Sequence, residues 1–138
     1  MCHADMNKTL LTLSTIILLA FACEDSTGIT DKTKREEDEQ LLVQLYKEIE
    51  ALSKSVSCTE EDEWKFVAIG SKACGGPTGY IAYSTQINEE QFLEKVTYYS
   101  EQQKSFNTKW GIASTCDIPA EPTDVICEDG KPVFVYPQ

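Results

Sequence analysis

The stretch of sequence that decides the fold is WKFVAIGSKACGGPTGYIAYS, residues 64–84. Its first part, residues 64–69, is rich in aromatic and β-branched side chains and predicts a strand. Residues 71–79 contain glycines and a proline that break regular structure, so they predict a loop. Residues 80–84, YIAYS, predict a second strand. The unit is therefore strand, glycine-rich loop, strand.

A helix is predicted to follow these strands. Asn88 can cap its first turn, Gln91 stands three residues later as in a capping box, and Ile87 has the spacing of a hydrophobic staple with Phe92. Gly111 is expected to end the helix. The buried stripe is formed by apolar residues at helical spacing: Phe92, Val96, Tyr99 and Phe106.

The C-terminal part of the chain predicts a hairpin. Two short apolar segments, residues 124–127 and 132–136, flank the pair Asp129-Gly130, which is typical of a two-residue turn. Pro119 and Pro122 keep the preceding segment extended and loop-like.

An amphipathic helix is predicted over residues 35–57, ahead of the domain. Residues 36–39 are acidic and lie where the helix dipole favours negative charge; they lack the spacing and central glycine of a Ca²⁺ loop. We expect its apolar stripe to contact the domain core, with a self-association seam as the alternative. The stripe recurs every three or four positions: Leu41, Leu42, Leu45, Ile49, Leu52 and Val56.

Together these elements predict an α+β fold. Residues 58–138 are expected to form a small antiparallel sheet with one packed helix, preceded by the N-terminal amphipathic helix. Disulfides are expected to staple this domain because its core is small.

The charge of the chain excludes one class of partner. The 138 residues contain 12 basic and 23 acidic side chains, which gives a net charge of −11. Nucleic acid is not an expected partner, because phosphate binding needs clustered positive charge. A cationic protein fits this charge, and a glycan stays open as a ligand.

Residues 1–22 predict a signal peptide. Lys8 precedes an apolar run from Leu10 to Ala22 that is shorter than the ~20 residues of a membrane-spanning helix. Met6 gives this segment a cleaner start than Met1, and both starts stay open.

The apolar run ends in AFAC, residues 20–23, which resembles the lipobox of bacterial lipoproteins. The resemblance implies cleavage before Cys23 and a lipid on its thiol that attaches the chain to a membrane. The acidic residues after Cys23 resemble the export signal of Bacteroidetes-type lipoproteins, which implies the outer face of the outer membrane. The alternative is an ordinary secretory signal. Residues 23–34 are mostly polar and predict a flexible tether.

Four cysteines follow Cys23, and an oxidising compartment favours disulfides between them. Their spacing lacks the close pairs that a Cys₄ zinc site needs. Of three possible connectivities we prefer the nested one, Cys58–Cys127 with Cys74–Cys116. This pairing clips both ends of the domain and ties the central loop to the end of the second helix.

The string AIGSKACGGPTGYIAYS, followed by a helix, Ser114-Thr115-Cys116 and Cys-x-x-Gly-Lys at residues 127–131, resembles a group of small secreted bacterial domains. The shared feature is a CGGP loop, here residues 74–77, before a Y-x-x-Y-S strand. The resemblance spans roughly residues 58–131. It implies export and fold, and no particular chemistry.

The residues predict a binding protein rather than an enzyme. The only histidine, His3, precedes the predicted cleavage site, so the exported chain has no imidazole for nucleophilic catalysis or metal ligation. No cofactor or metal is expected. We interpret the glycines of the CGGP motif as a tight turn, with an anion-binding nest as the alternative.

We therefore expect an exported, lipid-anchored binding or inhibitor module without catalytic activity. Its rigid loop would lose little entropy on binding. The alternative is an accessory subunit of an envelope assembly that docks through the helix over residues 35–56. The expected binding residues surround the CGGP motif: Gly75, Gly76, Thr78, Tyr80 and Tyr83.

The substitution Cys23→Ser tests the lipid anchor. Without the thiol no lipid can be attached, so the protein should move to the soluble fraction or keep its signal peptide. Cell fractionation and mass spectrometry of the N-terminus measure both outcomes. A variant that remains membrane-bound and normally processed would contradict the lipoprotein interpretation.

Overall fold

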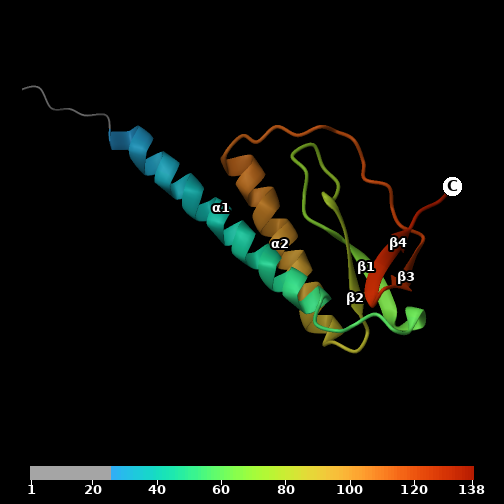
Figure 1. Ribbon diagram of the computed structural model, residues 1–138. Helices are drawn as coiled ribbons and strands as arrows, with labels where there is room; N and C mark the ends of the chain where they lie inside the picture. The colour runs from blue at the N-terminus through green and yellow to red at the C-terminus, as the bar shows by residue number, and fades with distance from the viewer. Residues whose placement is uncertain (1–25) are drawn as a thin grey trace, which may run out of the picture.

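The computed structural model describes residues 26–138 and contains two helices and two small antiparallel sheets (Figure 1). The predicted α+β class is confirmed at this level. The expected signal peptide and Cys23 lie outside the described residues. No helix within residues 26–138 is long and apolar enough to cross a bilayer. The elements are α1 (Ser26–Ser53), the short 3₁₀ helix η1 (Glu61–Glu63), β1 (Trp64–Ile69), β2 (Gly79–Ser84), α2 (Glu89–Lys109), β3 (Asp124–Glu128) and β4 (Lys131–Val135).

The β1–β2 hairpin is covered on both faces. Its strands pair antiparallel from Trp64 opposite Ser84 to Ile69 opposite Gly79, and successive side chains point to opposite faces. One face packs on the helices in a cluster made of Ile49, Ile69, Ile81, Tyr83, Phe92, Val96 and Tyr99. The other face packs on the β3–β4 hairpin in a second cluster made of Cys58, Trp64, Ala82 and Val125. The domain therefore has three layers (Figure 1).

The prediction of a single antiparallel sheet is wrong, because the four strands form two separate antiparallel hairpins. The β3–β4 hairpin stacks on β1–β2 instead of extending it. Phe66 of β1 and Phe134 of β4 meet edge to face, with ring centroids 6.2 Å apart. The reason is that β1 and β2 carry apolar side chains on both faces, so the second face also has to be removed from water.

Helix α1 is longer at its N-terminus than predicted. It begins at Ser26, so residues 26–34, which were expected in a flexible tether, are helical. Ion pairs one turn apart support this extension: Lys32 with Glu36 at 4.0 Å and Arg35 with Glu39 at 3.2 Å. The polar composition of the segment suggested a tether. A helix that is exposed on all sides has the same composition, because it buries no apolar face.

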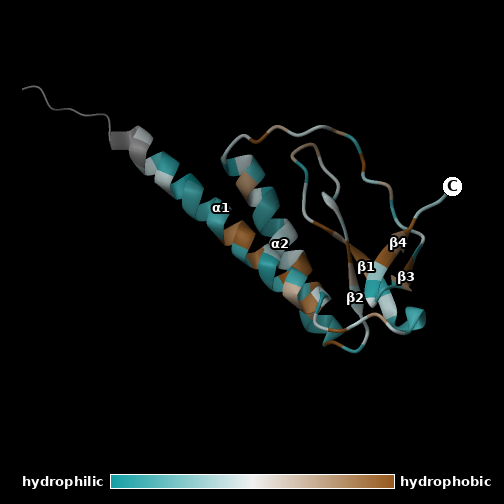
Figure 2. Cartoon of the chain, in the orientation of Figure 1, coloured by the Kyte–Doolittle hydropathy of each residue, from teal (hydrophilic) through white to brown (hydrophobic). Residues whose placement is uncertain are grey.

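The apolar stripe of α1 contacts the core, as predicted. Leu42, Leu45, Ile49 and Leu52 pack in or against the helix-side cluster. Leu41 stays 45% exposed. Helix α1 ends at Ser53 and not at residue 57 as predicted, so Val56 lies beyond the helix and packs on the second cluster. Figure 2 shows this division along α1, whose first half is hydrophilic and whose second half carries the apolar residues beside α2.

Helix α2 has the predicted ends. The Asn88 side chain accepts a hydrogen bond from the backbone N–H of Gln91 at 3.1 Å. At the other end Gly111 has a φ of 58°, and Ile112 N–H donates to the Asn107 carbonyl at 3.0 Å. This is the hydrogen bond of a Schellman motif, so the glycine ends the helix as expected.

The C-terminal hairpin and one disulfide are also confirmed. Asp129 and Gly130 both have positive φ, 49° and 75°, as a type I′ turn requires. The disulfide Cys58–Cys127 joins residues 69 apart in sequence and fixes β3 to the chain after α1. Cys58 N–H also donates to the Gly130 carbonyl at 3.0 Å. The β3–β4 hairpin is therefore held by a covalent bond and a main-chain bond.

Removing this disulfide should destabilise the domain. The double substitution Cys58→Ala with Cys127→Ala is expected to lower the free energy of unfolding by roughly 2–5 kcal/mol, since a long loop is released in the unfolded chain. Urea unfolding without reductant measures the change. An unfolding midpoint equal to that of the unsubstituted chain would contradict this role of the bridge.

Candidate functional site

The β1–β2 loop, residues 70–78, which contains the CGGP motif, is fixed at its base by side chains of α2. Gly70 N–H donates to Ser100 Oγ at 2.9 Å, and Ser71 N–H donates to Gln103 Oε1 at 2.7 Å. Asn107 Nδ2 donates to the Ser71 carbonyl at 2.8 Å. Gly70 has a φ of 81°, and a Cβ there would lie 2.6 Å from Gln103 Oε1. The start of the loop therefore requires glycine.

The loop uses many of its polar groups internally. The N–H and the hydroxyl of Thr78 both donate to the Ile69 carbonyl, at 3.0 and 2.9 Å. Gly75 N–H donates to the Lys72 carbonyl, and Lys72 N–H donates to the Gly76 carbonyl. These N–H groups donate to carbonyls of the loop itself, as in a tight turn, whereas an anion-binding nest would direct its N–H groups toward a ligand.

The second predicted disulfide is not formed in this structure. Cys74 and Cys116 are exposed free thiols, and Cys74 Sγ lies 3.4 Å from Ser114 Oγ. Hydrogen bonding with the Cys116 thiol, and then with Ser114, lowers the pKa of Cys74, whereas Cys74 raises the pKa of Cys116. Lys72 ties the same two segments together, since Lys72 Nζ lies 3.0 Å from Asp117 Oδ2. The two thiols are therefore neighbours without a covalent bond.

The structure divides the five expected binding residues between the surface and the core. Gly75 and Gly76 are exposed at the loop tip, and Thr78 is exposed with its hydroxyl turned to the Ile69 carbonyl. Tyr80 is half-buried on β2. Tyr83 is only 3% exposed and belongs to the core, which corrects its expected place on a binding surface. The cause is strand alternation, which points Tyr83 to the helix-covered face.

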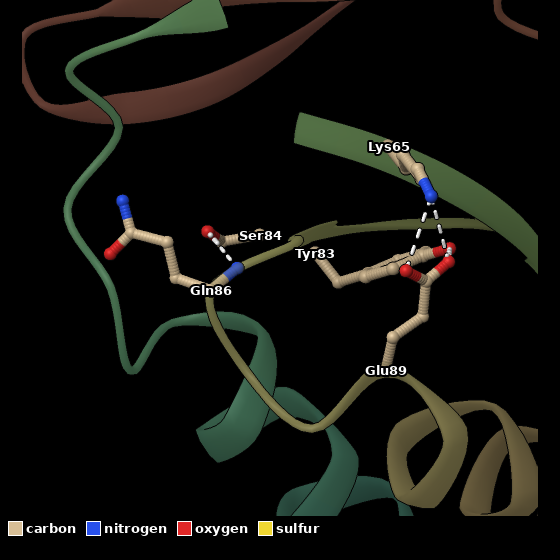
Figure 3. Close-up of polar contacts among 5 residues, drawn as sticks. All are labelled: Lys65, Tyr83, Ser84, Gln86 and Glu89. Carbon is tan, nitrogen blue, oxygen red and sulfur yellow. Dashed lines mark hydrogen bonds and ion pairs between the residues drawn. The ribbon is translucent and has the colours of Figure 1, made fainter. Parts of the chain in front are cut away.

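Tyr83 takes part in a polar cluster that joins the hairpin to α2 (Figure 3). Its hydroxyl donates to Glu89 Oε1 at 2.9 Å, and Lys65 Nζ contacts both carboxylate oxygens of Glu89 at 2.9 and 3.1 Å. Burial, followed by the contact with Glu89, raises the pKa of Tyr83 to about 12. Hydrogen bonds from Lys65 and Tyr83 lower the pKa of Glu89. The cluster therefore favours a protonated Tyr83 and an ionised Glu89, and it anchors the start of α2.

A groove beside Tyr80 is the feature that the sequence did not reveal. It has a volume of about 630 Å³ and lies between the end of α1, β2 and β4. We call it the Tyr80 groove. It is lined by residues from three distant parts of the chain: Ser53, Lys54, Val56, Ser57, Tyr80, Ile81, Ala82, Gly130, Lys131, Pro132 and Phe134. Only Tyr80 among these was expected from the sequence to take part in binding.

Aromatic rings stiffen this groove. Tyr80 and Phe66 meet edge to face with centroids 6.0 Å apart, and Phe66 contacts Phe134 in the same way. Ser53 Oγ donates to the Ala82 carbonyl at 2.6 Å and so fixes the end of α1 to β2. The groove is therefore bounded by elements whose relative positions are set by packing and hydrogen bonding.

A second, shallower hollow lies along α1 and α2. It has a volume of about 600 Å³, and its lining includes Val43 and Tyr46, which are 53% and 39% exposed. The Tyr46 ring lies 5.6 Å from that of Tyr99. Within residues 26–138 no group of three or more His, Cys, Asp or Glu side chains is placed to hold a metal ion.

The neighbouring thiols lead to a prediction on reactivity. In the reduced protein, iodoacetamide should modify Cys74 before Cys116, because the thiolate is the nucleophile and the pKa of Cys74 is the lower of the two. In a separate sample that has not been alkylated, oxidised glutathione should link Cys74 to Cys116 and be reduced to two molecules of glutathione. Peptide mapping by mass spectrometry measures both results. Equal alkylation rates, or linkage of either cysteine to a different residue, would contradict the described arrangement.

Comparison of the chain with known proteins identifies no similar protein. No protein-family model matches the chain, and searches of curated proteins and of solved structures find no match either. The interpretation of the site therefore depends on its own geometry.

Proposed function

We propose that this protein is an exported, lipid-anchored module that binds a protein partner without catalysing a reaction. The observation that supports it best is the Tyr80 groove, which exposes apolar and aromatic surface between three fixed elements. Concave surfaces of this kind, with a few polar groups at their edge, are the usual place for a ligand. The signal-like segment ending at Cys23 supports the exported location.

The stiffness of the groove favours binding. The disulfide Cys58–Cys127 holds the β3–β4 hairpin, and the bond from Ser53 to Ala82 holds the end of α1. A surface ordered before binding loses less conformational entropy when a partner is bound. The module thus presents a preformed site.

The chemistry of the lining residues favours binding over turnover. Ser53 donates its hydroxyl hydrogen to the Ala82 carbonyl, which occupies that hydroxyl in a structural bond. The ionisable groups of the groove are the ammonium groups of Lys54 and Lys131 and the phenol of Tyr80, whose pKa is raised by burial. Imidazole and carboxylate groups are the most frequent general acids and bases, and the lining of the groove contains neither.

The partner is proposed to be a protein, with a glycan as the second ligand class. The net charge of −11 favours approach of a cationic protein through long-range attraction, even where the contact surface has other chemistry. Aromatic rings such as Tyr80 and Phe134 can contact either an apolar side chain or a sugar ring.

A second candidate function is supported by the exposed residues of α1. Leu41, Val43 and Tyr46 are 45%, 53% and 39% exposed on this helix. Apolar side chains gathered on one helix can mark a protein contact. In this case the protein is an accessory subunit of an envelope assembly and docks through α1.

A pull-down with two variants separates the two functions. The full chain with a C-terminal tag is captured from detergent-solubilised cells and from secretions of its surroundings, as unsubstituted protein, as Tyr80→Thr and as Val43→Glu. The proposed function expects that Tyr80→Thr lowers capture of the recovered partner by about tenfold, which corresponds to one lost anchor of about 1.4 kcal/mol. Val43→Glu should leave capture unchanged.

The opposite pattern supports the accessory role, since loss with Val43→Glu alone places the contact on α1. Threonine, like tyrosine, is favoured in strands, and thermal unfolding of each variant checks that the fold is retained. Capture that survives Tyr80→Thr in a folded protein contradicts a partner site in the Tyr80 groove.

A further inference from the structure

One edge of β2 has no strand beside it within residues 26–138, and the end of α1 contacts this edge at the Ala82 carbonyl. Thr85 N–H donates to the Glu63 carbonyl at 2.7 Å, which sets the alternation of hydrogen-bonded pairs along β1 and β2. By that alternation the main-chain groups of Tyr80 and Ala82 point away from β1. The Ala82 carbonyl accordingly accepts its hydrogen bond from Ser53 of α1. In the described part of the chain no strand pairs with this edge.

The Tyr80 groove reaches this edge. Tyr80 and Ile81 are consecutive residues of a strand, so their side chains point to opposite faces of the hairpin. Both nevertheless line the groove, together with Ala82. Ser53, which donates to the outward carbonyl of Ala82, also lines the groove, so the groove reaches this edge of β2.

The charged side chains that line the groove are basic although the whole protein is acidic, and the carboxylate that acts on Tyr80 is that of Glu121, outside the lining. Its lining residues include two lysines, Lys54 and Lys131, and no carboxylate. Lys54 pairs with Glu50 at 2.7 Å. None of the ion pairs found in residues 26–138 involves Lys131, although Glu128 stands opposite it in the hairpin. An ammonium group beside an apolar groove is complementary to a ligand carboxylate.

We propose that the Tyr80 groove binds an extended, acidic peptide segment of a partner protein as an added strand on β2. The segment forms main-chain hydrogen bonds with the outward groups of Tyr80 and the N–H of Ala82, as in other cases of strand addition. One apolar side chain of the segment contacts Tyr80 and Phe134, and a carboxylate pairs with Lys131. This proposal rests on the proposed function and specifies its ligand.

The edge of β2 and the charge together favour a peptide over other occupants. A neutral glycan has neither a carboxylate nor main-chain groups at strand spacing. A second copy of this chain carries the same two lysines, so an isologous contact at the groove would bring like charges together. An acidic peptide can form hydrogen bonds with the edge of β2, contact the aromatic rings of the groove and pair with the ammonium group of Lys131.

The test selects peptides with the purified full chain in detergent. A random linear dodecapeptide library is screened, and the enriched peptides are synthesised and titrated by fluorescence anisotropy. We expect enriched peptides to share an acidic residue beside β-branched or aromatic residues. The substitution Lys131→Glu should weaken them by at least about tenfold, whereas the matched charge change Lys104→Glu on α2 should leave affinity unchanged.

A second measurement addresses the mode of binding. Each enriched peptide is N-methylated at one amide at a time. If the peptide adds as a strand, the effect of methylation should alternate along it. Binding should be about tenfold weaker when the methyl group replaces the hydrogen of an N–H that faces β2, and should change little at the next residue. If Lys131→Glu changes the thermal unfolding of the protein, the titration is repeated with Lys131→Gln, which removes the charge without reversing it.

Several outcomes overturn the proposal. The proposal is wrong if the library enriches basic peptides or no peptides, or if Lys104→Glu weakens peptide binding as much as Lys131→Glu does. It is also wrong if the effect of N-methylation does not alternate along the peptide, or if a glycan or a second copy of the chain occupies the groove. If partner capture still depends on Tyr80 while acidic peptides do not bind, the proposed function stands and this ligand is wrong. If acidic peptides bind but capture does not depend on Tyr80, the peptide site stands and the proposed function fails.

Discussion

The structure depends on one constraint, which is that the β1–β2 hairpin must be buried on both faces. Ile81 and Tyr83 point toward the helices, while Trp64 and Ala82 point toward the β3–β4 hairpin. Because strand side chains alternate, a shift of one residue in either strand would place each set on the wrong side. The positions of both helices and of the second hairpin follow from this alternation, and Phe92 at 0% exposure shows how completely the helix side is covered.

The Tyr80 groove is a consequence of the same arrangement. The groove lies where β2 of one hairpin, β4 of the other and the chain after α1 come together without filling the space between them. The links that stabilise the layers also shape the groove: the bridge from Cys58 to Cys127 and the bond from Ser53 to Ala82. Stability and a preformed surface therefore come from the same contacts.

Much of the fold could be predicted from the sequence because its signals are local. The cap at Asn88, the helix end at Gly111 and the Asp129-Gly130 turn each depend on a few neighbouring residues, and each was found in the structure. The separation into two hairpins and the burial of Tyr83 depend on contacts between distant segments, so local patterns did not reveal them. The groove was missed for the same reason, since its lining comes from three parts of the chain.

The length of α1 has a mechanical consequence. Asp38 is held at the end of α2 by Lys109 at 2.6 Å and by Trp110 at 2.9 Å, and the described side chains of residues 28–37 before it are exposed. Helix α1 thus runs on past α2 (Figure 1), by about 18 Å at 1.5 Å per residue over residues 26–37. A helical arm keeps its length and direction, unlike a random coil. In the lipid-anchored protein that we propose, tilting of this arm would therefore carry the whole domain with it.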